Sequence, residues 1–405
     1  MRISLEQATE LIRTRINPLA PKRLPLFEAL GCITAESVKA QMNQPPFPRS
    51  PYDGYALRAI DSMGASSENP VSLIVVGQSF AGKPSEKSVG KGEAVRIMTG
   101  GVIPDGADCV IPQEKTDEGE QTAKIYKELR SKENYCEQGE DFLKGTEIIP
   151  CGVPVTAAVI GVAASAGCTE LLVYPKPRVA VLSTGDELQA LGFPLKKGQI
   201  YSSNSQYLLG RIEELHLLVT GKELVRDDIL ELERAFLIAN EEADLVICTG
   251  GVSAGMKDLV PEALEKLGAE IVFHGVDIKP GMPAALAILK GKPVLALSGN
   301  PFACAVTFEL LARSAIAALA SNPNLEARHF EAKLKGEYSK ARPVRRFARA
   351  FFENGKVSVA GEQGNGQLRT MIGTNCLAEL PAGNDPLSEG TLIDVYFLGD
   401  NVYGC

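Results

Sequence analysis

The sequence has no long run of basic residues, and its 42 lysines and arginines are outnumbered by 50 aspartates and glutamates. An acidic chain without a basic stripe does not suit nucleic-acid binding, which depends on cations that pair with phosphates. We therefore expect no nucleic-acid partner. An anionic substrate would need local help from a helix N-terminus, a few lysines or a divalent cation.

Cysteine pairs and targeting segments are also missing. The nine cysteines include no C-x-x-C pair, and Cys109, Cys168, Cys248 and Cys304 stand in apolar contexts typical of buried free thiols. This usage favours a reducing compartment. The N-terminal segment has no signal-peptide core, and the most apolar stretch, residues 153–167, is too short to span a bilayer. We expect a cytoplasmic protein with no membrane partner.

The motifs of several common enzyme classes are absent as well. The turn after RVAVLS reads TGDEL instead of G-x-G-x-x-G, which disfavours a dinucleotide site. No P-loop and no G-x-S-x-G nucleophile elbow occurs. The three histidines are far apart and lack H-x-x-x-H spacing, so we expect no zinc site.

The patterns that are present predict several domains in 405 residues. From Arg178 onward, apolar strands (RVAVLSTG, ADLVICTGG, AEIVFHGV, KPVLALSGN) alternate with helical stretches at residues 202–215, 228–240, 258–267 and 300–319. This alternation predicts a doubly wound, mostly parallel sheet with helices on both faces, an α/β fold. Ligands of such sheets bind at the carboxyl ends of the strands.

The flanking regions have different patterns. An amphipathic helix occupies the first residues and ends near Pro18. Residues 71–141 show short strands separated by glycine turns, which predicts a β-rich domain. After Asn322 the pattern is again that of strands around glycine turns, which predicts a compact β domain at the C-terminus.

Polar residues follow four strands of the predicted sheet. They are Glu187 after the first; Gly250, Gly251, Ser253, Gly255 and Asp258 after another; Lys279 after a third; and Gly299, Asn300 and Pro301 after a fourth. Glycines let the backbone approach a ligand, and exposed N–H groups can hold phosphate. An N-cap asparagine followed by proline would open a helix whose positive end faces the site. The alternative is that these segments are ordinary tight turns.

The acids Glu187, Asp227, Asp228 and Asp258 would repel an anionic ligand unless a metal lay between them. Mg²⁺ held by hard oxygen ligands resolves that conflict and suits phosphoanhydride cleavage. We therefore predict a magnesium site. Helix capping is the alternative for one of Asp227 and Asp228, and also for Asp258.

The order of the motifs resembles that of a known family, the molybdopterin molybdenumtransferases, which include the E domain of gephyrin. The matching segments are SPYDGYALR, RIMTGGVIPDGADCVI, GEDFLKG, VAVLSTGDEL, GQIYSSNS, VRDD, DLVICTGGVSAGMKD, IKPG, LSGNP and QGNGQLRTM. They cover essentially the whole chain. Ten motifs in the family's order are far more specific than any one of them.

The resemblance implies four segments. Residues 1–20 and 178–326 would form an α/β molybdopterin-binding domain similar to the molybdopterin adenylyltransferases. Residues 21–45 and 142–177 would form a small linking domain, with residues 46–141 as an inserted β-rich domain, and residues 327–405 would form a C-terminal β-barrel. The resemblance also implies a homodimer in which the inserted domain of one subunit completes the other's site, and contact with the molybdopterin adenylyltransferase.

The implied reaction is Mg²⁺-dependent insertion of molybdenum from molybdate into adenylylated molybdopterin, with release of AMP. By motif position, Asp53, Thr99, Glu187, Asp227 and Asp258 are the candidate catalytic residues, with metal ligands Glu187, Asp227 and Asp258. The candidate substrate-binding residues are Gly250, Gly251, Ser253, Gly255, Lys279, Gly299, Asn300, Pro301, Asp141 and Arg369.

Three departures from the family's pattern leave alternatives open. Met282 stands where the family often has a second lysine, Gly275 replaces a common basic residue, and Ser298 changes LPGNP to LSGNP. Fewer cations should weaken anion binding or change the preferred anion. A tungstate-preferring paralogue is therefore one alternative. Adenylyltransferase activity and a non-catalytic scaffold of the same fold are two others.

Overall fold

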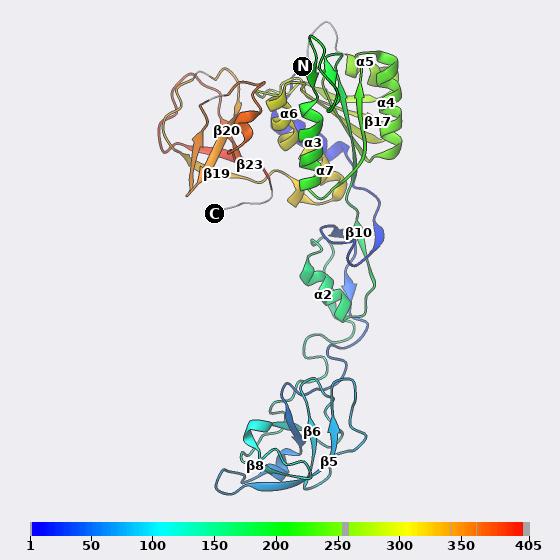
Figure 1. Cartoon of the computed structure of the whole chain (residues 1–405), viewed down its shortest axis with the longest axis vertical. Helices are drawn as coiled ribbons and strands as arrows, with labels where there is room; N and C mark the ends of the chain where they lie inside the picture. Colours follow the sequence, from blue (N-terminus) through cyan, green and yellow to red (C-terminus); the bar gives the residue numbers. More distant parts are fainter. Residues whose placement is uncertain (1, 253–258, 341, 362, 400–405) are drawn as a thin grey trace. The chain divides into compact units, whose positions relative to one another are not determined.

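The computed structural model describes residues 2–252, 259–340, 342–361 and 363–399 (Figure 1). The predicted site residues Ser253, Gly255 and Asp258 lie outside these ranges. The chain divides into two compact units. Arg23–Leu172 form one unit, and the residues up to Lys22 together with those from Val173 onward form the other, which we call the α/β–barrel unit.

A six-stranded sheet lies at the centre of the α/β–barrel unit, in the order β14-β11-β15-β18-β17-β16. Its strands are β11 (Arg178–Thr184), β14 (Leu218–Val225), β15 (Leu245–Thr249), β16 (Glu270–His274), β17 (Ala285–Leu289) and β18 (Lys292–Leu297). β14, β11, β15 and β18 pair in parallel, which confirms the predicted mostly parallel sheet. The antiparallel β17 was not predicted.

The reversal at β17 does not change the direction of the strand beyond it. β17 runs antiparallel to both β18 and β16, so β16 points the same way as β18. The carboxyl ends of β11, β15, β18 and β16 therefore share one edge of the sheet. The segments that follow these four strands can meet there, as the sequence predicts.

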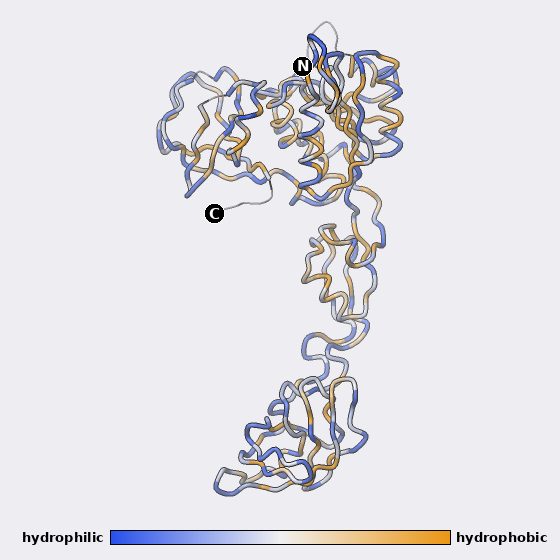
Figure 2. Tube along the Cα trace, viewed as in Figure 1, coloured by the Kyte–Doolittle hydropathy of each residue, from blue (hydrophilic) through white to orange (hydrophobic). Residues whose placement is uncertain are grey.

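Helices cover both faces of this sheet (Figure 1). They are α1 (Leu5–Arg15), α3 (Ser203–Glu214), α4 (Ile229–Glu242), α5 (Leu259–Lys266), α6 (Pro301–Thr307) and α7 (Arg313–Ala320). Val179 and Val181 of β11 share a core with α1, α3, α6 and α7, whereas Ala180 and Leu182 share one with α4 and α5. Because both faces are buried, the inner strands β11, β15, β17 and β18 are largely apolar, and hydrophobic segments gather in this part of the chain in Figure 2. The edge strand β14 is more polar and contains Lys222 and Glu223.

The helical stretch after β18 departs from the single helix that we predicted. A π-helical turn, η3 (Phe308–Ala312), separates α6 from α7. This turn carries the buried Glu309, which accepts hydrogen bonds from Arg211 and Arg313. By length and composition, Pro301–Ala320 is apolar enough to cross a membrane, but 94% of its apolar window is buried inside the unit. It is a core helix.

The C-terminal part of the unit is a closed barrel in the order β19-β21-β20-β22-β23, which confirms the predicted β domain. Its strands are β19 (His329–Leu334), β20 (Arg346–Glu353), β21 (Lys356–Val359), β22 (Cys376–Leu380) and β23 (Leu392–Phe397). Backbone bonds join it to the loop after β16: the Lys279 N–H donates to the Arg345 carbonyl (3.0 Å), and the Phe347 N–H donates to the Lys279 carbonyl (2.8 Å). Barrel residues are thus held beside the edge where the four strands end.

Short elements complete the α/β–barrel unit. β12 (Leu188–Gln189) and β13 (Ile200–Tyr201) form a two-stranded parallel pair between β11 and α3. Two 3-10 turns, η4 (Pro323–Leu325) and η5 (Arg369–Met371), lie before the barrel and within it. In α1, the predicted N-terminal helix, Ser4 and Gln7 form a capping box, and the helix ends at Arg15, before Pro18.

The Arg23–Leu172 unit is built mainly of short strands. A five-stranded sheet, β7-β4-β6-β5-β8, comprises β4 (Gly54–Leu57), β5 (Val71–Ser79), β6 (Glu93–Ile97), β7 (Cys109–Pro112) and β8 (Thr122–Ile125). The remaining elements are β1 (Lys22–Pro25), β2 (Ile33–Thr34), β3 (Val38–Lys39), η1 (Ala59–Ser62), η2 (Gln113–Lys115), β9 (Glu147–Ile149), α2 (Ala157–Ser165) and β10 (Glu170–Tyr174). The predicted β-rich pattern of residues 71–141 is confirmed.

Candidate active site

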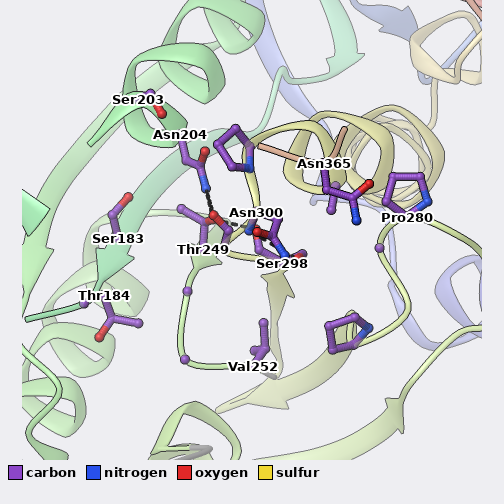
Figure 3. Close-up of a pocket in the computed structure, with 18 of the residues that line it drawn as sticks. Ser183, Thr184, Ser203, Asn204, Thr249, Val252, Pro280, Ser298, Asn300 and Asn365 are labelled. Carbon is purple, nitrogen blue, oxygen red and sulfur yellow. Dashed lines mark hydrogen bonds between the residues drawn. The ribbon is translucent and has the colours of Figure 1, made fainter. Parts of the chain in front are cut away.

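A cavity of about 710 Å³ lies at the shared edge of the sheet (Figure 3). Residues from all four strand ends line it, and so do three from the barrel region, Pro343, Val344 and Asn365. Of the predicted site residues, the lining contains Glu187, Asp227, Gly250, Gly251, Lys279, Gly299, Asn300 and Pro301. The structure therefore brings together residues that are more than a hundred positions apart in the sequence.

The acidic side of the cavity is formed by the end of β11 and the segment before α4. The Thr184 hydroxyl donates to Asp227 Oδ1 over 2.8 Å, so this carboxylate is held at the strand end. The Glu187 carboxylate folds back over Gly185: a Cβ atom on Gly185 would lie 2.6 Å from Glu187 Oε2. This carboxylate is the mobile end of a side chain and could move away from an added Cβ, so the positive φ of Gly185 (155°) is the stronger reason for glycine at this position.

Asp227 and Asp228 have different roles. Asp228 is the N-cap of α4, and its Oδ1 accepts from the N–H groups of Leu230 (2.9 Å) and Glu231 (3.0 Å). Asp227 lines the cavity instead. The capping alternative is therefore confirmed for Asp228. Of the two aspartates, only Asp227 lines the cavity.

Two of the three predicted metal ligands line the cavity. Glu187 and Asp227 both line the cavity, while Asp258 lies outside the described residues. Within the ranges that the structure describes, no group of three or more His, Cys, Asp or Glu side chains is arranged to hold a metal ion. Two carboxylates beside one cavity still suit a hard cation such as Mg²⁺, which commonly keeps several waters and binds substrate oxygens.

The glycines after β15 have a packing role that the sequence did not reveal. A Cβ atom on Gly250, whose φ is 96°, would lie 2.2 Å from the Thr184 carbonyl oxygen. A Cβ atom on Gly251 would meet Thr184 and Val260 side-chain atoms at 3.0 Å. The turn after β15 thus packs closely against the end of β11. These glycines shape the cavity wall through that close approach.

Neutral polar groups form another wall that sequence reasoning did not select. The Asn204 amide donates to Thr249 Oγ1 (3.0 Å) and to the Gly299 carbonyl (2.8 Å), as Figure 3 shows for the first bond. Thr249 Oγ1 in turn donates to the Ser298 carbonyl (3.0 Å). These hydrogen bonds link the ends of β15 and β18 to α3. The GQIYSSNS segment was the available signal for Asn204, but its partners are distant in sequence.

The side of the cavity near α6 suits an anion. Lys279 is the one lysine or arginine among the described lining residues. Asn300 is the N-cap of α6 and Pro301 its first residue, as predicted, although the Asn300 side chain makes no capping hydrogen bond. The helix begins at the cavity, so its positive end faces the space beside Lys279.

Three predicted residues belong to the Arg23–Leu172 unit. Asp53 Oδ1 accepts from the Thr99 N–H (2.7 Å) and from the Thr99 hydroxyl (2.8 Å). The Thr99 N–H above all, and then its hydroxyl, lower the pKa of Asp53. Asp141 is exposed, and its N–H donates to the Gln44 carbonyl.

Arg369 is the fourth described candidate residue that does not line the cavity. It is exposed in η5 of the barrel.

The buried thiols near the sheet are packing residues. The eight described cysteines are free; Cys109, Cys248 and Cys304 are buried, as predicted, while Cys168 is only half-buried. Burial raises the pKa of Cys248 and Cys304 to about 12. Such thiols are protonated at neutral pH and serve as packing residues.

Comparison with known proteins covers nearly the whole chain. Residues 3–167 match the MoeA N-terminal region (domain I and II), residues 180–318 a probable molybdopterin binding domain, and residues 331–398 the MoeA C-terminal region (domain IV). The molybdopterin molybdenumtransferase of Staphylococcus epidermidis is 34% identical over 99% of this chain and 97% of its own length. That of Staphylococcus aureus is 34% identical over 97% and 95%.

Solved structures agree with these sequence matches. A molybdopterin biosynthesis MoeA protein from Pyrococcus horikoshii has a TM-score of 0.83 and 31% identity, with 98% of this chain and 99% of that chain covered. A second MoeA structure from that organism has a TM-score of 0.78 and 26% identity, covering 98% and 100%. The similarity therefore extends through both units and the barrel.

Proposed function

Because the chain belongs to the molybdopterin molybdenumtransferase family, we propose that it inserts molybdenum from molybdate into adenylylated molybdopterin, with Mg²⁺ and with release of AMP. It is accordingly a transferase of molybdenum cofactor biosynthesis. The choice of molybdate, the need for Mg²⁺ and the loss of AMP are parts of the proposal that experiment must test.

One observation carries the proposal: a single cavity combines two carboxylates on one side with Lys279 and the start of α6 on another. The cationic side suits phosphate and molybdate oxygens. The acidic side would repel them unless a divalent cation lay between. A pocket with both properties fits a substrate whose phosphoanhydride is cleaved with metal assistance.

The residues present fit a magnesium ion on the acidic side. Glu187 and Asp227 would hold it, because Mg²⁺ is usually bound by one or two carboxylates and otherwise by water and phosphate oxygens. When bound, the ion would supply charge neutralisation for the leaving phosphate. Thr184 contributes by donating a hydrogen bond to Asp227, which orients that carboxylate.

The remaining cavity residues position the substrate. We propose that Lys279 binds an oxyanion and that the turn of Gly299, Asn300 and Pro301 places it at the positive end of α6. The Asn204–Thr249 hydrogen bond keeps the neutral wall rigid, so the reacting groups are held in one orientation.

A second candidate, a preference for tungstate, is favoured by one residue. Met282 lines the cavity three residues after Lys279, where the resemblance leads us to expect a lysine. With one cation fewer, the wall holds an oxyanion less tightly. Because molybdate and tungstate have the same shape and charge, a small difference in binding free energy then decides which of them is preferred.

The test is a reconstituted assay of the purified protein with adenylylated molybdopterin, Mg²⁺ and either molybdate or tungstate, following AMP release. We expect release that depends on molybdate and is lost in Glu187→Ala. Faster release with tungstate would support the paralogue. No release with either anion from a well-folded protein would favour the scaffold function instead.

A further inference from the structure

Asn365 reaches the cavity from the barrel, in the segment between β21 and η5 (Figure 3). Its side chain is exposed, and its backbone carbonyl accepts a 2.9 Å hydrogen bond from the N–H of Phe302 in the first turn of α6. That bond fixes the segment on the same helix end that faces the site. Asn365 is therefore placed by a specific contact between the barrel and α6.

The fully buried Arg349 on β20 holds this segment from behind. Its Nη2 donates to the Gly364 carbonyl (2.8 Å) and to the Gln367 carbonyl (2.6 Å), one on each side of Asn365. The guanidinium carbon also lies 3.6 Å from the centre of the Phe302 ring. One side chain thus contacts both the turn that carries Asn365 and the residue to which Asn365 is bonded.

Gln363 completes the support. Its Oε1 accepts from the Arg349 N–H and its Nε2 donates to the Arg349 carbonyl, each over 3.0 Å. Burying a guanidinium is costly unless its donors are used. Here the Nη2 group makes two hydrogen bonds to one loop, and that loop carries Asn365 to the cavity wall.

We infer that Asn365 is a substrate-contacting residue whose amide donates to an oxyanion of the substrate, and that Arg349 is the residue that positions it. The inference rests on the proposed function. Lys279 is the one cation among the described lining residues, so a neutral donor on a nearby wall adds to oxyanion binding. The oxyanion is either the substrate phosphate or molybdate, and separate titrations of the two distinguish them.

The first experiment compares Asn365→Asp with Asn354→Asp. Asn354 is also an exposed asparagine of the barrel, in the turn between β20 and β21, and does not line the cavity. A carboxylate at position 365 should raise the KM for one of the two oxyanions about tenfold or more, with kcat changed little. Asn354→Asp should leave both KM values unchanged.

The second experiment tests the positioning role with Arg349→Lys and a matched control, Arg342→Lys. Arg342 is buried in the same barrel and donates to the carbonyls of Lys340, Pro381 and Asp385, none of which lines the cavity. Both variants should lower the unfolding temperature. Arg349→Lys alone should raise the KM that Asn365→Asp raises, since lysine lacks the planar fork that reaches two carbonyls.

A double variant separates positioning from general loosening. If Arg349 acts through Asn365, Arg349→Lys combined with Asn365→Ala should raise KM no further than Asn365→Ala alone. The inference would be overturned if the KM increases of the two single variants multiplied in the double variant. It would also be overturned if Arg342→Lys raised KM as much as Arg349→Lys, or if Asn365→Asp left KM unchanged.

Calorimetric titration with AMP and with molybdate provides a readout that does not depend on turnover. If the wild type does not release AMP but Asn365→Asp still weakens binding of one probe about tenfold, the proposed function fails and Asn365 keeps its role. If neither AMP nor molybdate binds the wild type, both the proposed function and the role of Asn365 are contradicted.

Discussion

At the residue scale, two adjacent aspartates illustrate how the same side chain acquires different functions. Asp228 is exposed and caps α4, whereas Asp227 is half-buried at the cavity and accepts from Thr184. Sequence reasoning recognised that capping explained one of the two. The local pattern did not identify which one, because the choice depends on where β11 ends in space; only the resemblance named Asp227 as a candidate catalytic residue.

These roles predict opposite outcomes for the same substitution. Asp227→Asn removes a carboxylate from the cavity and should slow AMP release roughly a hundredfold, as loss of one charge-stabilising group commonly does. Asp228→Asn should leave both the rate and the unfolding temperature nearly unchanged, because asparagine caps helices as well as aspartate does. Steady-state kinetics and thermal unfolding of the two variants decide the matter. Equal rate losses would contradict the assignment.

Asp53 allows a pH prediction at the same scale. Thr99→Val removes one of the two hydrogen bonds that lower the pKa of this carboxyl, so that pKa should rise while staying below its usual value. A depressed pKa stabilises the fold above the pKa of the unfolded chain, near 3.9, and that stabilisation disappears as the pH falls through the folded value. Carboxyl carbon NMR titration of the wild type and Thr99→Val measures the shift. An unchanged pKa would show that the hydroxyl bond is absent in solution.

At the element scale, the turn after β15 depends on the close approach of two strand ends. Gly250→Ala would place a methyl group 2.2 Å from the Thr184 carbonyl, at a φ of 96°. Gly291→Ala is the matched control, since Gly291 has a φ of 80° and an added Cβ would meet nothing within 4 Å. The control should lose about 1–2 kcal/mol of unfolding free energy from backbone strain.

Gly250→Ala should lose about 2 kcal/mol more than the control, because the turn must move away from β11. Denaturant unfolding of both variants measures the difference. AMP release should fall in Gly250→Ala only, since the displaced turn changes the shape of the cavity beside Thr184. Similar stability losses in the two variants would mean that the turn yields without strain.

The same scale shows how far the sequence predicts the fold and the site. The strands β11, β15, β16 and β18 and their shared edge follow from apolar runs and polar residues, and so eight predicted site residues meet at one cavity. The reversed β17 and the π turn before Arg313 were missed because tertiary packing, not local periodicity, decides them. Asn204 and Asn365 were missed for the same reason: their significance comes from partners distant in the sequence.

At the scale of the whole molecule, the candidate residues fall into two groups. Every described residue that lines the cavity belongs to the α/β–barrel unit, while Asp53, Thr99 and Asp141 belong to the Arg23–Leu172 unit. The four-segment division of the chain and the homodimer stay predictions from the resemblance. If both groups serve one reaction, they meet either within one chain or across two subunits.

Mixing two inactive variants distinguishes these arrangements. Asp53→Ala alters the Arg23–Leu172 unit and Glu187→Ala alters the cavity, so each homodimer should be inactive. If the groups meet across subunits, a heterodimer keeps one intact site, formed by the unaltered unit of one chain and the unaltered cavity of the other. Random mixing after unfolding and refolding should then restore about a quarter of the wild-type AMP release per subunit.

If the groups instead meet within one chain, every chain in the mixture carries a defect in its own site, and refolding together restores nothing. The control is a mixture of Glu187→Ala with Asp227→Asn, two changes in the same cavity, which should stay inactive in either arrangement because no site can escape both defects. Recovery in the first mixture alone would assign Asp53 and Thr99 to the partner's site, and would make the dimer a requirement of the reaction. Absence of recovery, with heterodimers demonstrated by mass spectrometry, would place both groups in one chain.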